Sequence, residues 1–283
     1  MLTTYLRIAW RTLIRNKSFS AINIFGLALG ITCSLLIMLW VYDERSVDGF
    51  HKNGDHLFQV YERHYHDGQA DAGYSTQGLL AQELKKVVPE IEYAASFDYA
   101  GAPGTANNFE AGEKVNKLFG FYTGEDVFHM FSYPLLQGNE KALNGPASIA
   151  ISRKMADYFF GSPEAAFGKT IRFDNKDDLQ VTAVFENIPA RSSQKFDFLR
   201  SWTDYVKQNQ WVNNWGNTSP DTYVQLRKDA NKEKVDAKIK DFVYGYMQRS
   251  AGSRVELALQ PFREKYLHST FKEAQPAGGR IEY

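Results

Sequence analysis

The stretch AINIFGLALGITCSLLIMLWV, residues 21–41, decides the class of this protein. It has no formal charge and is apolar on every face of a helix, and at 1.5 Å per residue it spans roughly 31 Å, the thickness of a bilayer core. A buried helix of a soluble domain is seldom apolar all round over this length. A cleaved signal peptide ends in small residues, whereas this run ends in Leu39, Trp40 and Val41. We therefore predict a retained transmembrane helix over residues 18–43.

Charge is distributed unevenly on the two sides of this helix. The 283 residues contain 33 Lys and Arg against 33 Asp and Glu, so the net charge is zero, which argues against a generally basic nucleic-acid binder. The first 42 residues carry four basic residues and no acidic one, whereas Asp43, Glu44 and Asp48 follow the apolar run. Because basic residues favour the cytoplasmic side, we expect a cytoplasmic N-terminus and a body outside the membrane.

The four basic residues are Arg7, Arg11, Arg15 and Lys17. The arginines are four apart and alternate with apolar residues at helical spacing, which predicts an amphipathic helix over residues 1–17. Such a helix lies along the inner membrane surface, with its basic side chains in contact with lipid headgroups. The alternative interpretation is a solvated positive flank.

Small residues inside the span suggest a helix contact. Gly26 and Gly30 form a GxxxG pair, which lets a second helix approach closely, although the motif is short enough to occur by chance. Cys33, the only cysteine, lies in mid-span and is interpreted as a small apolar residue. A disulfide framework within the chain and a cysteine-rich zinc module are therefore excluded.

The body, residues 44–283, is predicted to be a mixed α+β domain with two subdomains, since helices and strands are interspersed without regular alternation. Its lack of cysteine fits a bacterial periplasm better than a eukaryotic exterior. Expected strands cover residues 57–65, 91–99, 170–173, 179–185 and, last, 255–259. Expected helices follow an apolar stripe from 79 to 88, run from the cap Ser152 to Gly161, and run from 231 to about 248. A loop is expected at 101–104 and a hairpin turn at 175–178.

Motifs for catalysis are weak. Gly168-Lys169-Thr170 resembles the end of a phosphate-binding loop, but that motif needs a glycine where Pro163 stands, so we expect no ATP binding by this chain. His64 and His66 share a strand face without an evident third metal ligand. The pair Asp177-Asp178 is expected in a turn, and Trp211 and Trp215 are expected to pack in a loop or to stack on a ligand. No catalytic, cofactor-binding or metal-binding residue is predicted.

The sequence resembles MacB/FtsX-type ABC transporter permeases. The resemblance begins with YLRIAWR (5–11), RNKSF (15–19), INIFGLALG (22–30), Asp43-Glu44 and Phe50-His51. It continues with Ile151-Ser152 through FFG (159–161), GKTI (168–171), VTAV (181–184), Ile188-Pro189, Ser192-Ser193 and FDFL (196–199).

The resemblance implies a first transmembrane helix, a large periplasmic core domain and three further transmembrane helices, of which this chain, ending at Tyr283, contains only the first. It also implies an elbow at Lys17–Phe19 that joins the surface helix to the span. Implied partners are a separate cytoplasmic ATPase subunit, a second permease copy in a homodimer or pseudo-dimer, membrane lipid and a periplasmic adaptor. No nucleic acid is implied.

The expected function is that of the N-terminal part of such a permease in a bacterial inner membrane. It would couple ATP hydrolysis by its partner to export of a substrate such as an antibiotic, a peptide or a lipoprotein. The alternative is a membrane-anchored extracytoplasmic sensor or ligand-binding module, but about 18 internal residues are too few for a signalling domain. An anchored hydrolase is disfavoured by the missing nucleophile and metal patterns.

Overall fold

The computed structural model describes residues 2–282, in two units: a helical unit up to Ser46 and a sheet domain from Val47 onward. Met1 and Tyr283, which belong to the expected N-terminal helix and body, lie outside the described residues. The described helices are α1 (Leu2–Arg15), α2 (Lys17–Arg45), α3 (Leu80–Val87), α4 (Val127–Met130), α5 (Arg153–Phe160), α6 (Pro163–Ala166), α7 (Trp202–Gln208), α8 (Lys232–Ile239) and α9 (Phe262–Lys265).

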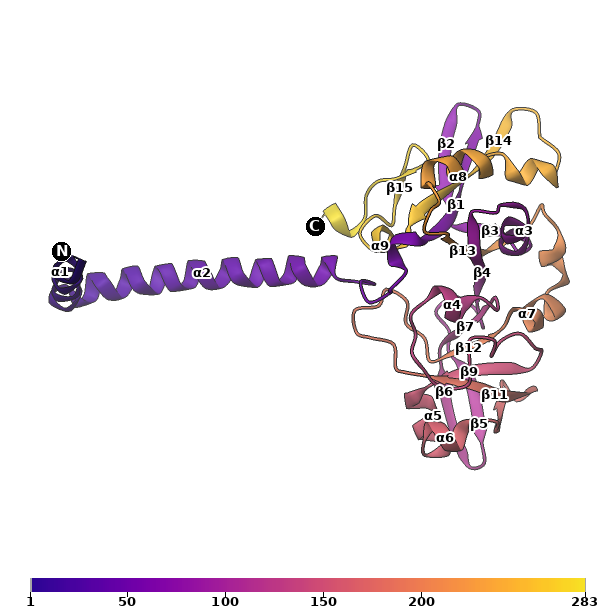
Figure 1. Cartoon of the computed structure of the whole chain (residues 1–283), viewed down its shortest axis with the longest axis horizontal. Coiled ribbons are helices and arrows are strands. Elements are labelled where there is room, and N and C mark those ends of the chain that lie inside the picture. Colours follow the sequence, from indigo (N-terminus) through magenta and orange to yellow (C-terminus); the bar gives the residue numbers. More distant parts are fainter. Residues whose placement is uncertain (1, 283) are drawn as a thin grey trace. The chain divides into compact units, whose positions relative to one another are not determined.

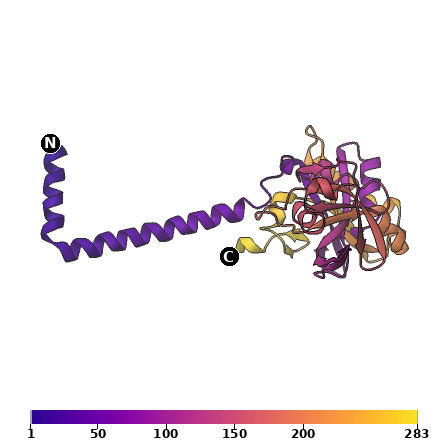
Figure 2. The same cartoon turned by 90° about the horizontal axis from the view of Figure 1, so that it is seen from below.

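The helical unit contains the predicted apolar helix. Its helix α2 has 29 residues and a length and composition sufficient to cross a membrane. The hydroxyl groups of Thr32 and Ser34 donate to the carbonyl oxygens of Ala28 and Gly30, at 2.8 and 2.9 Å, so these polar side chains are satisfied within the helix itself. The expected elbow at residues 17–19 is misplaced, because the helical dihedral angles are interrupted at Asn16, with φ −110° and ψ 58°, where the chain changes direction (Figure 2).

One mixed sheet runs through the whole sheet domain (Figure 1), in the order β14-β1-β13-β4-β7-β12-β9-β11-β10-β5-β6. Strands β2, β3 and β8 pair with β1, β13 and β11, and β15 and β16 form a separate two-stranded sheet. The strands are β1 (Leu57–His66), β2 (Gln69–Gly73), β3 (Ser75–Gln77), β4 (Ile91–Tyr99), β5 (Asn107–Ala111), β6 (Lys114–Leu118), β7 (Gly120–Thr123), β8 (Leu135–Gln137), β9 (Ser148–Ser152), β10 (Thr170–Phe173), β11 (Asp177–Phe185), β12 (Phe198–Ser201), β13 (Thr218–Leu226), β14 (Ser253–Pro261), β15 (Phe271–Lys272) and β16 (Gln275–Pro276).

The core of the sheet domain is divided among three hydrophobic clusters, although the sheet itself is continuous. Helices α3 and α8 supply apolar side chains to the cluster on β1, β4, β13 and β14, and α5, α6 and α7 supply those on β9, β10 and β11. The central cluster is rich in aromatic rings, including Phe131, Tyr133, Tyr223 and Phe262. The predicted α+β class is confirmed, and the expected subdomains are not separated by a break in the sheet.

Several boundaries follow the expected chemistry. Helix α5 begins after Ser152, whose hydroxyl accepts the N–H of Met155 at 3.2 Å, and ends at Gly161, whose φ is +92°. Strands β1, β4 and β10 match their predicted positions. The hairpin turn lies at residues 174–176 instead of 175–178, because Asp174 and Asn175 adopt positive φ angles that short polar side chains tolerate.

The predicted late helix is about nine residues too long. Helix α8 ends at Ile239, and a 3-10 turn, Phe242–Gly245, follows. The chain leaves the helix because its polar groups bind the outer edge of β14: the carbonyl of Lys240 accepts from Leu257 N–H at 2.9 Å, and the hydroxyl of Tyr244 accepts from Val255 N–H at 2.6 Å. The carboxylate of Asp236 accepts from Leu259 N–H at 2.7 Å. Strand β14 is also not the last strand, since β15 and β16 follow it and are too short to show periodicity.

Candidate functional site

The basic residues of the helical unit lie where the sequence placed them. Arg7, Arg11 and Arg15 follow one another at four-residue spacing along α1, whose last residue is Arg15, and all three are exposed. Lys17, also exposed, is the first residue of α2. A row of cations without acidic residues on the same helix can bind anionic lipid headgroups.

The glycine pair leaves an open face on α2. A Cβ atom built on Gly26 or Gly30 meets no atom within 4 Å in the described structure. Close packing of the chain on itself therefore does not require glycine at these positions, and the open face remains available for a second helix.

The start of the sheet domain forms a buried clasp, defined here as Asp48, His51 and the Arg191–Gln194 loop. The Asp48 N–H donates to the carbonyl of Arg191 at 2.8 Å, and the Asp48 carboxylate accepts from the N–H of Ser193 at 2.8 Å. Asp48 is 1% exposed and has a φ of +59°. Burial raises the pKa of its carboxyl group, while the bonds from Ser193 act in the opposite direction. Asp48, which the sequence analysis named only as an acidic residue after the apolar run, is therefore a buried part of the sheet domain.

His51 fixes the next turn of the clasp. Its Nδ1 atom accepts the N–H of Ser132 at 3.1 Å, and the Ser132 hydroxyl accepts the N–H of Lys52 at 2.9 Å, so the two segments bind each other reciprocally. The ring packs edge-on against Phe131, Tyr133 and Phe262, with centroids 5.3 to 5.5 Å away. Burial lowers the pKa of His51 to about 4, and the positive charge of Arg263 acts in the same direction.

Arg263, on α9, fixes the far end of the same segment. Its guanidinium donates to the carbonyl of His51 at 3.3 Å and pairs with Asp55. A side chain at Gly54 would collide with this guanidinium, since a Cβ atom there would lie 2.4 Å from Arg263 Nε. The chain is thus held at Asp48, His51 and Asp55 within eight residues.

A polar chain continues from the clasp into the sheet domain. The Gln194 side chain accepts from the hydroxyl of Tyr133 at 3.3 Å and donates to the hydroxyl of Tyr223 at 3.1 Å. Lys265 donates to the same Tyr223 hydroxyl at 3.0 Å and lies 3.4 Å from Asp221. Burial lowers the pKa of Lys265, and Asp221 partly opposes that effect. Since Ser193 binds Asp48 and Gln194 joins this chain, one loop connects the two.

The Gly168-Lys169-Thr170 segment, which resembles the end of a phosphate-binding loop, is a turn between α6 and β10. The Gly168 N–H donates to Val181 O at 2.8 Å, and the Lys169 N–H donates to Ala166 O at 3.0 Å. Pro163 is the first residue of α6. The amide groups that would hold a phosphate are thus occupied by the backbone of the domain.

The other sequence candidates form no common site. His64 pairs with Glu62 at 3.1 Å, and within residues 2–282 no group of three or more metal-ligating side chains is found. Asp177 and Asp178 lie in β11 instead of a turn. Trp215 stacks on Tyr246, with ring centroids 4.0 Å apart, as the packing interpretation predicted.

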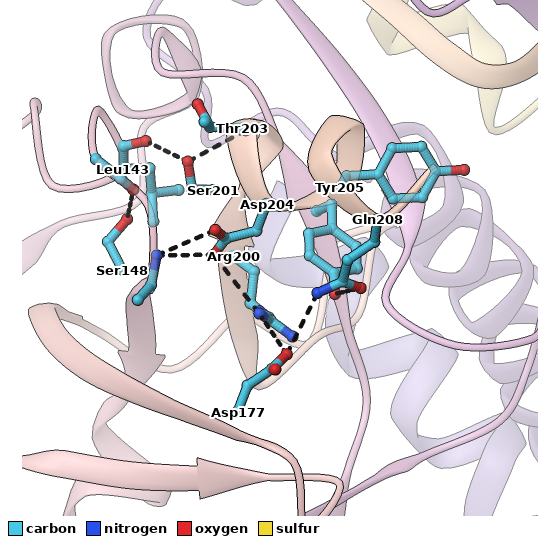
Figure 3. A network of polar contacts seen from close by, with 12 residues as sticks. Leu143, Ser148, Asp177, Arg200, Ser201, Thr203, Asp204, Tyr205 and Gln208 are labelled. Atoms are coloured by element: carbon cyan, nitrogen blue, oxygen red, sulfur yellow. Dashed lines mark hydrogen bonds and ion pairs between the residues drawn. The ribbon is translucent and has the colours of Figure 1, made fainter. Parts of the chain in front are cut away.

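A buried charge network occupies the sheet near α7 (Figure 3). Arg200 is 1% exposed, lies between the rings of Tyr122 and Phe173, and reaches Asp177 at 3.1 Å and Asp204 at 3.5 Å. Both carboxylate oxygens of Asp204 also accept the N–H of Ala147, at 2.9 and 3.1 Å. The network joins β12, α7 and β11, and within residues 2–282 the Nε and Nη1 atoms of Arg200 have no hydrogen-bond partner.

Comparison with known proteins assigns the family. Residues 20–242 match the MacB-like periplasmic core domain family. The chain belongs to this family. The MacB-like domain is similar in structure to a domain assigned to a permease protein of Porphyromonas gingivalis, with a TM-score of 0.63 and 21% identity over 75% of this chain and 92% of that one.

Two further structures are more distant from the MacB-like domain. The periplasmic region of MacB from Actinobacillus actinomycetemcomitans gives a TM-score of 0.48 at 14% identity, over 69% of this chain and 87% of that one. The extracellular domain of the noncanonic ABC-type transporter YknZ from Gram-positive bacteria gives 0.47 at 13% identity, over 70% and 98%. Comparison with curated proteins finds no match. A helix able to cross a membrane, α2, leads into the sheet domain, and the match to the periplasmic family begins inside that helix, at residue 20.

Sequence reasoning missed the clasp of the MacB-like domain. Phe50-His51 and Ser192-Ser193 were noted as part of the resemblance, but nothing in their spacing indicates that segments more than 140 residues apart meet. The available signal was Asp48 beside Gly49 just after a helix, since aspartate tolerates the left-handed conformation that ends a helix sharply.

Proposed function

We propose that this chain is the N-terminal part of a MacB/FtsX-type permease, whose periplasmic domain moves when a separate cytoplasmic ATPase subunit hydrolyses ATP. The motion would export a substrate such as an antibiotic, a peptide or a lipoprotein. The observation that carries the proposal is the short path from membrane helix to clasp: α2 continues to Arg45, and only Ser46 and Val47 precede the buried Asp48.

A path this short favours mechanical transmission. Ser46 still has helical dihedral angles, and its N–H donates to the carbonyls of Tyr42 and Asp43 at 3.0 and 3.1 Å. No glycine or proline lies between Val41 and Asp48. Only Ser46 and Val47 could therefore absorb a displacement of the helix end before it acts on the Asp48–Ser193 bond.

The proposed setting is a bacterial inner membrane with the N-terminus in the cytoplasm. The basic stripe of α1 supports this orientation, because four cations precede the span. Contacts with anionic lipid, a second permease copy packed at Gly26 and Gly30, and a periplasmic adaptor complete the proposed assembly. The chain itself is proposed to bind no ATP, which the occupied Gly168 and Lys169 amides support.

Insertion of three glycines after Arg45 tests the transmission. In the complete transporter we expect ATP hydrolysis to persist while export is lost, because a flexible segment absorbs the displacement. Three glycines inserted in the exposed β5–β6 turn, between Gly112 and Glu113, serve as the matched control and should leave export intact. Normal export by the Arg45 insertion at normal abundance would contradict the proposal.

Orientation is tested by cysteine labelling. After Cys33→Ala, a membrane-impermeant thiol reagent added from the periplasmic side should modify Ser253→Cys, at the exposed start of β14, and should spare Thr12→Cys on α1. The reverse pattern would overturn the orientation and the transporter role with it.

A further inference from the structure

The sheet domain contains a cavity of about 870 Å³, lined in part by Gln194, Tyr223 and Lys265 of the polar chain, to which no ligand has been assigned above. Its walls come from the end of β4, from β7, from the start of β13, from residues 193–195 and from the segment after α9. This volume suits a drug-sized molecule, and such cavities bind ligands when an apolar wall is combined with a few polar groups.

Aromatic rings form one wall. Tyr99 lies 5.7 Å from Phe119 and 5.2 Å from Phe121, measured between ring centroids, and Phe119 and Phe121 are 5.2 Å apart. Phe97 extends this group at 6.1 Å from Phe121. Tyr99 is 40% exposed, so the wall is accessible. A flat apolar group can stack here.

The acidic groups of the cavity already have partners. The Asp98 carboxylate accepts from the hydroxyls of Tyr205 and Ser219, at 2.5 and 2.8 Å, and from the N–H of Tyr99 at 2.8 Å. Asp221 is paired with Lys265. A cationic ligand would therefore have to displace bonds that the protein makes to itself.

Two cations of the cavity have no carboxylate partner within residues 2–282. Lys195 donates to the carbonyls of Pro189 and Ala190, at 2.8 and 2.7 Å, so the acceptors of its ammonium group are neutral. The Arg280 guanidinium lies 4.7 Å from the ring centroid of Tyr266. The lining of the cavity holds three cations, Lys195, Lys265 and Arg280, against two carboxylates, Asp98 and Asp221, so its net positive charge favours an anion.

We infer that this cavity binds an amphipathic organic anion: an aromatic or alicyclic body packed on Phe97, Tyr99 and Phe121, with a carboxylate directed to Lys195 and Arg280. A net charge of one positive in the lining suits a single small anionic group and is too little for a polyanion. Lys195 belongs to the loop whose Ser193 binds Asp48, so the ligand would contact the loop that also holds the clasp. The assignment goes beyond the proposed transport role and does not depend on it.

Matched probes test the inference on the complete chain in lipid nanodiscs. Equilibrium dialysis measures binding of 2-naphthylacetate, its neutral amide and 2-naphthylethylammonium, with empty nanodiscs subtracted. We expect the carboxylate to bind at least tenfold more tightly than the amide, and the ammonium compound to bind more weakly still. Since this comparison uses only the unmodified protein, it does not depend on how any variant folds.

Charge-matched variants then locate the anion. Lys195→Gln with Arg280→Gln should abolish the tenfold preference, whereas Lys207→Gln with Lys228→Gln removes two exposed cations outside the cavity and should retain it. Equal binding of carboxylate and amide, tightest binding of the ammonium probe, or an unchanged preference in the Lys195/Arg280 variant would each overturn the inference.

Discussion

Replacement of Asp48 separates two contributions to the clasp, because this residue supplies both an acceptor and a left-handed backbone. Asp48→Ala removes the carboxylate that accepts the part-buried N–H of Ser193, and losing a hydrogen bond to a charged acceptor costs about 1 to 3 kcal/mol. It also places alanine at φ +59°, which costs about 1 to 2 kcal/mol more. We therefore expect Asp48→Ala to lower the free energy of unfolding by about 2 to 5 kcal/mol.

Two matched variants separate the cost of the lost acceptor from the cost of the left-handed backbone. Asp48→Gly removes only the acceptor and should cost about 1 to 3 kcal/mol, because glycine adopts the positive φ angle freely. Asp48→Asn keeps an oxygen acceptor and tolerates the left-handed region, so its cost should stay within about 1 kcal/mol. The order of destabilisation is then alanine, glycine, asparagine.

Urea unfolding of the complete chain in detergent, followed by tryptophan fluorescence, measures the series. A change in midpoint at constant slope reports stability alone. If asparagine destabilises as much as alanine, or if alanine has no effect, the clasp does not hold this segment in the way described. In the complete transporter, alanine and glycine should also reduce export more than ATP hydrolysis.

Three further predictions concern other parts of the chain. Asp204→Asn should lower the free energy of unfolding by about 3 kcal/mol in a urea titration, because Arg200 is buried and loses a partner, whereas Asp229→Asn in an exposed pair should change it by less than about 0.5 kcal/mol. As pH falls from 6.5 to 4, stability should fall by about 3 kcal/mol, because unfolded His51 binds a proton near 6.5 while the folded residue stays neutral to about 4. Asp48, whose pKa burial raises, acts in the opposite sense, so comparison with His51→Asn isolates the histidine; an unchanged pH profile in that variant would contradict its role. Leucine at both Gly26 and Gly30 should reduce the yield of cross-linking between helices in the membrane, whereas Ala28→Leu on the opposite face should not. Equal cross-linking yields for the two variants would contradict a helix contact at the glycine pair.

Local chemistry explains which elements could be predicted from the sequence. The helix from Ser152 to Gly161 has a cap at each end, and the apolar run of α2 is long and uniform enough to predict one continuous helix. The end of α8 depends on a different segment, because β14 takes up the carbonyl of Lys240 and the hydroxyl of Tyr244. No property of residues 232–248 alone shows that this segment bonds to β14.

The candidate site divides in the same way. The positions of Arg7, Arg11 and Arg15 on one helix follow from their spacing, and so does the glycine pair. The burial of Asp48, by contrast, depends on a loop more than 140 residues away, and the Arg200 network joins β12 to β11 across the intervening strand β9. Long-range pairing of this kind leaves no periodic signal in one sequence.

The polar groups bound along β14 affect whether the sheets of neighbouring molecules can pair at their edges. Val255, Leu257 and Leu259 each have their N–H groups taken by the segment around α8, so a strand from a neighbouring molecule finds no free donors at these three positions. At the opposite end of the sheet, β6 carries Lys114 and Lys117, and charged side chains on an edge strand disfavour pairing with a strand of another molecule. Pairing between the sheets of neighbouring copies is therefore disfavoured at these two edges, β14 and β6.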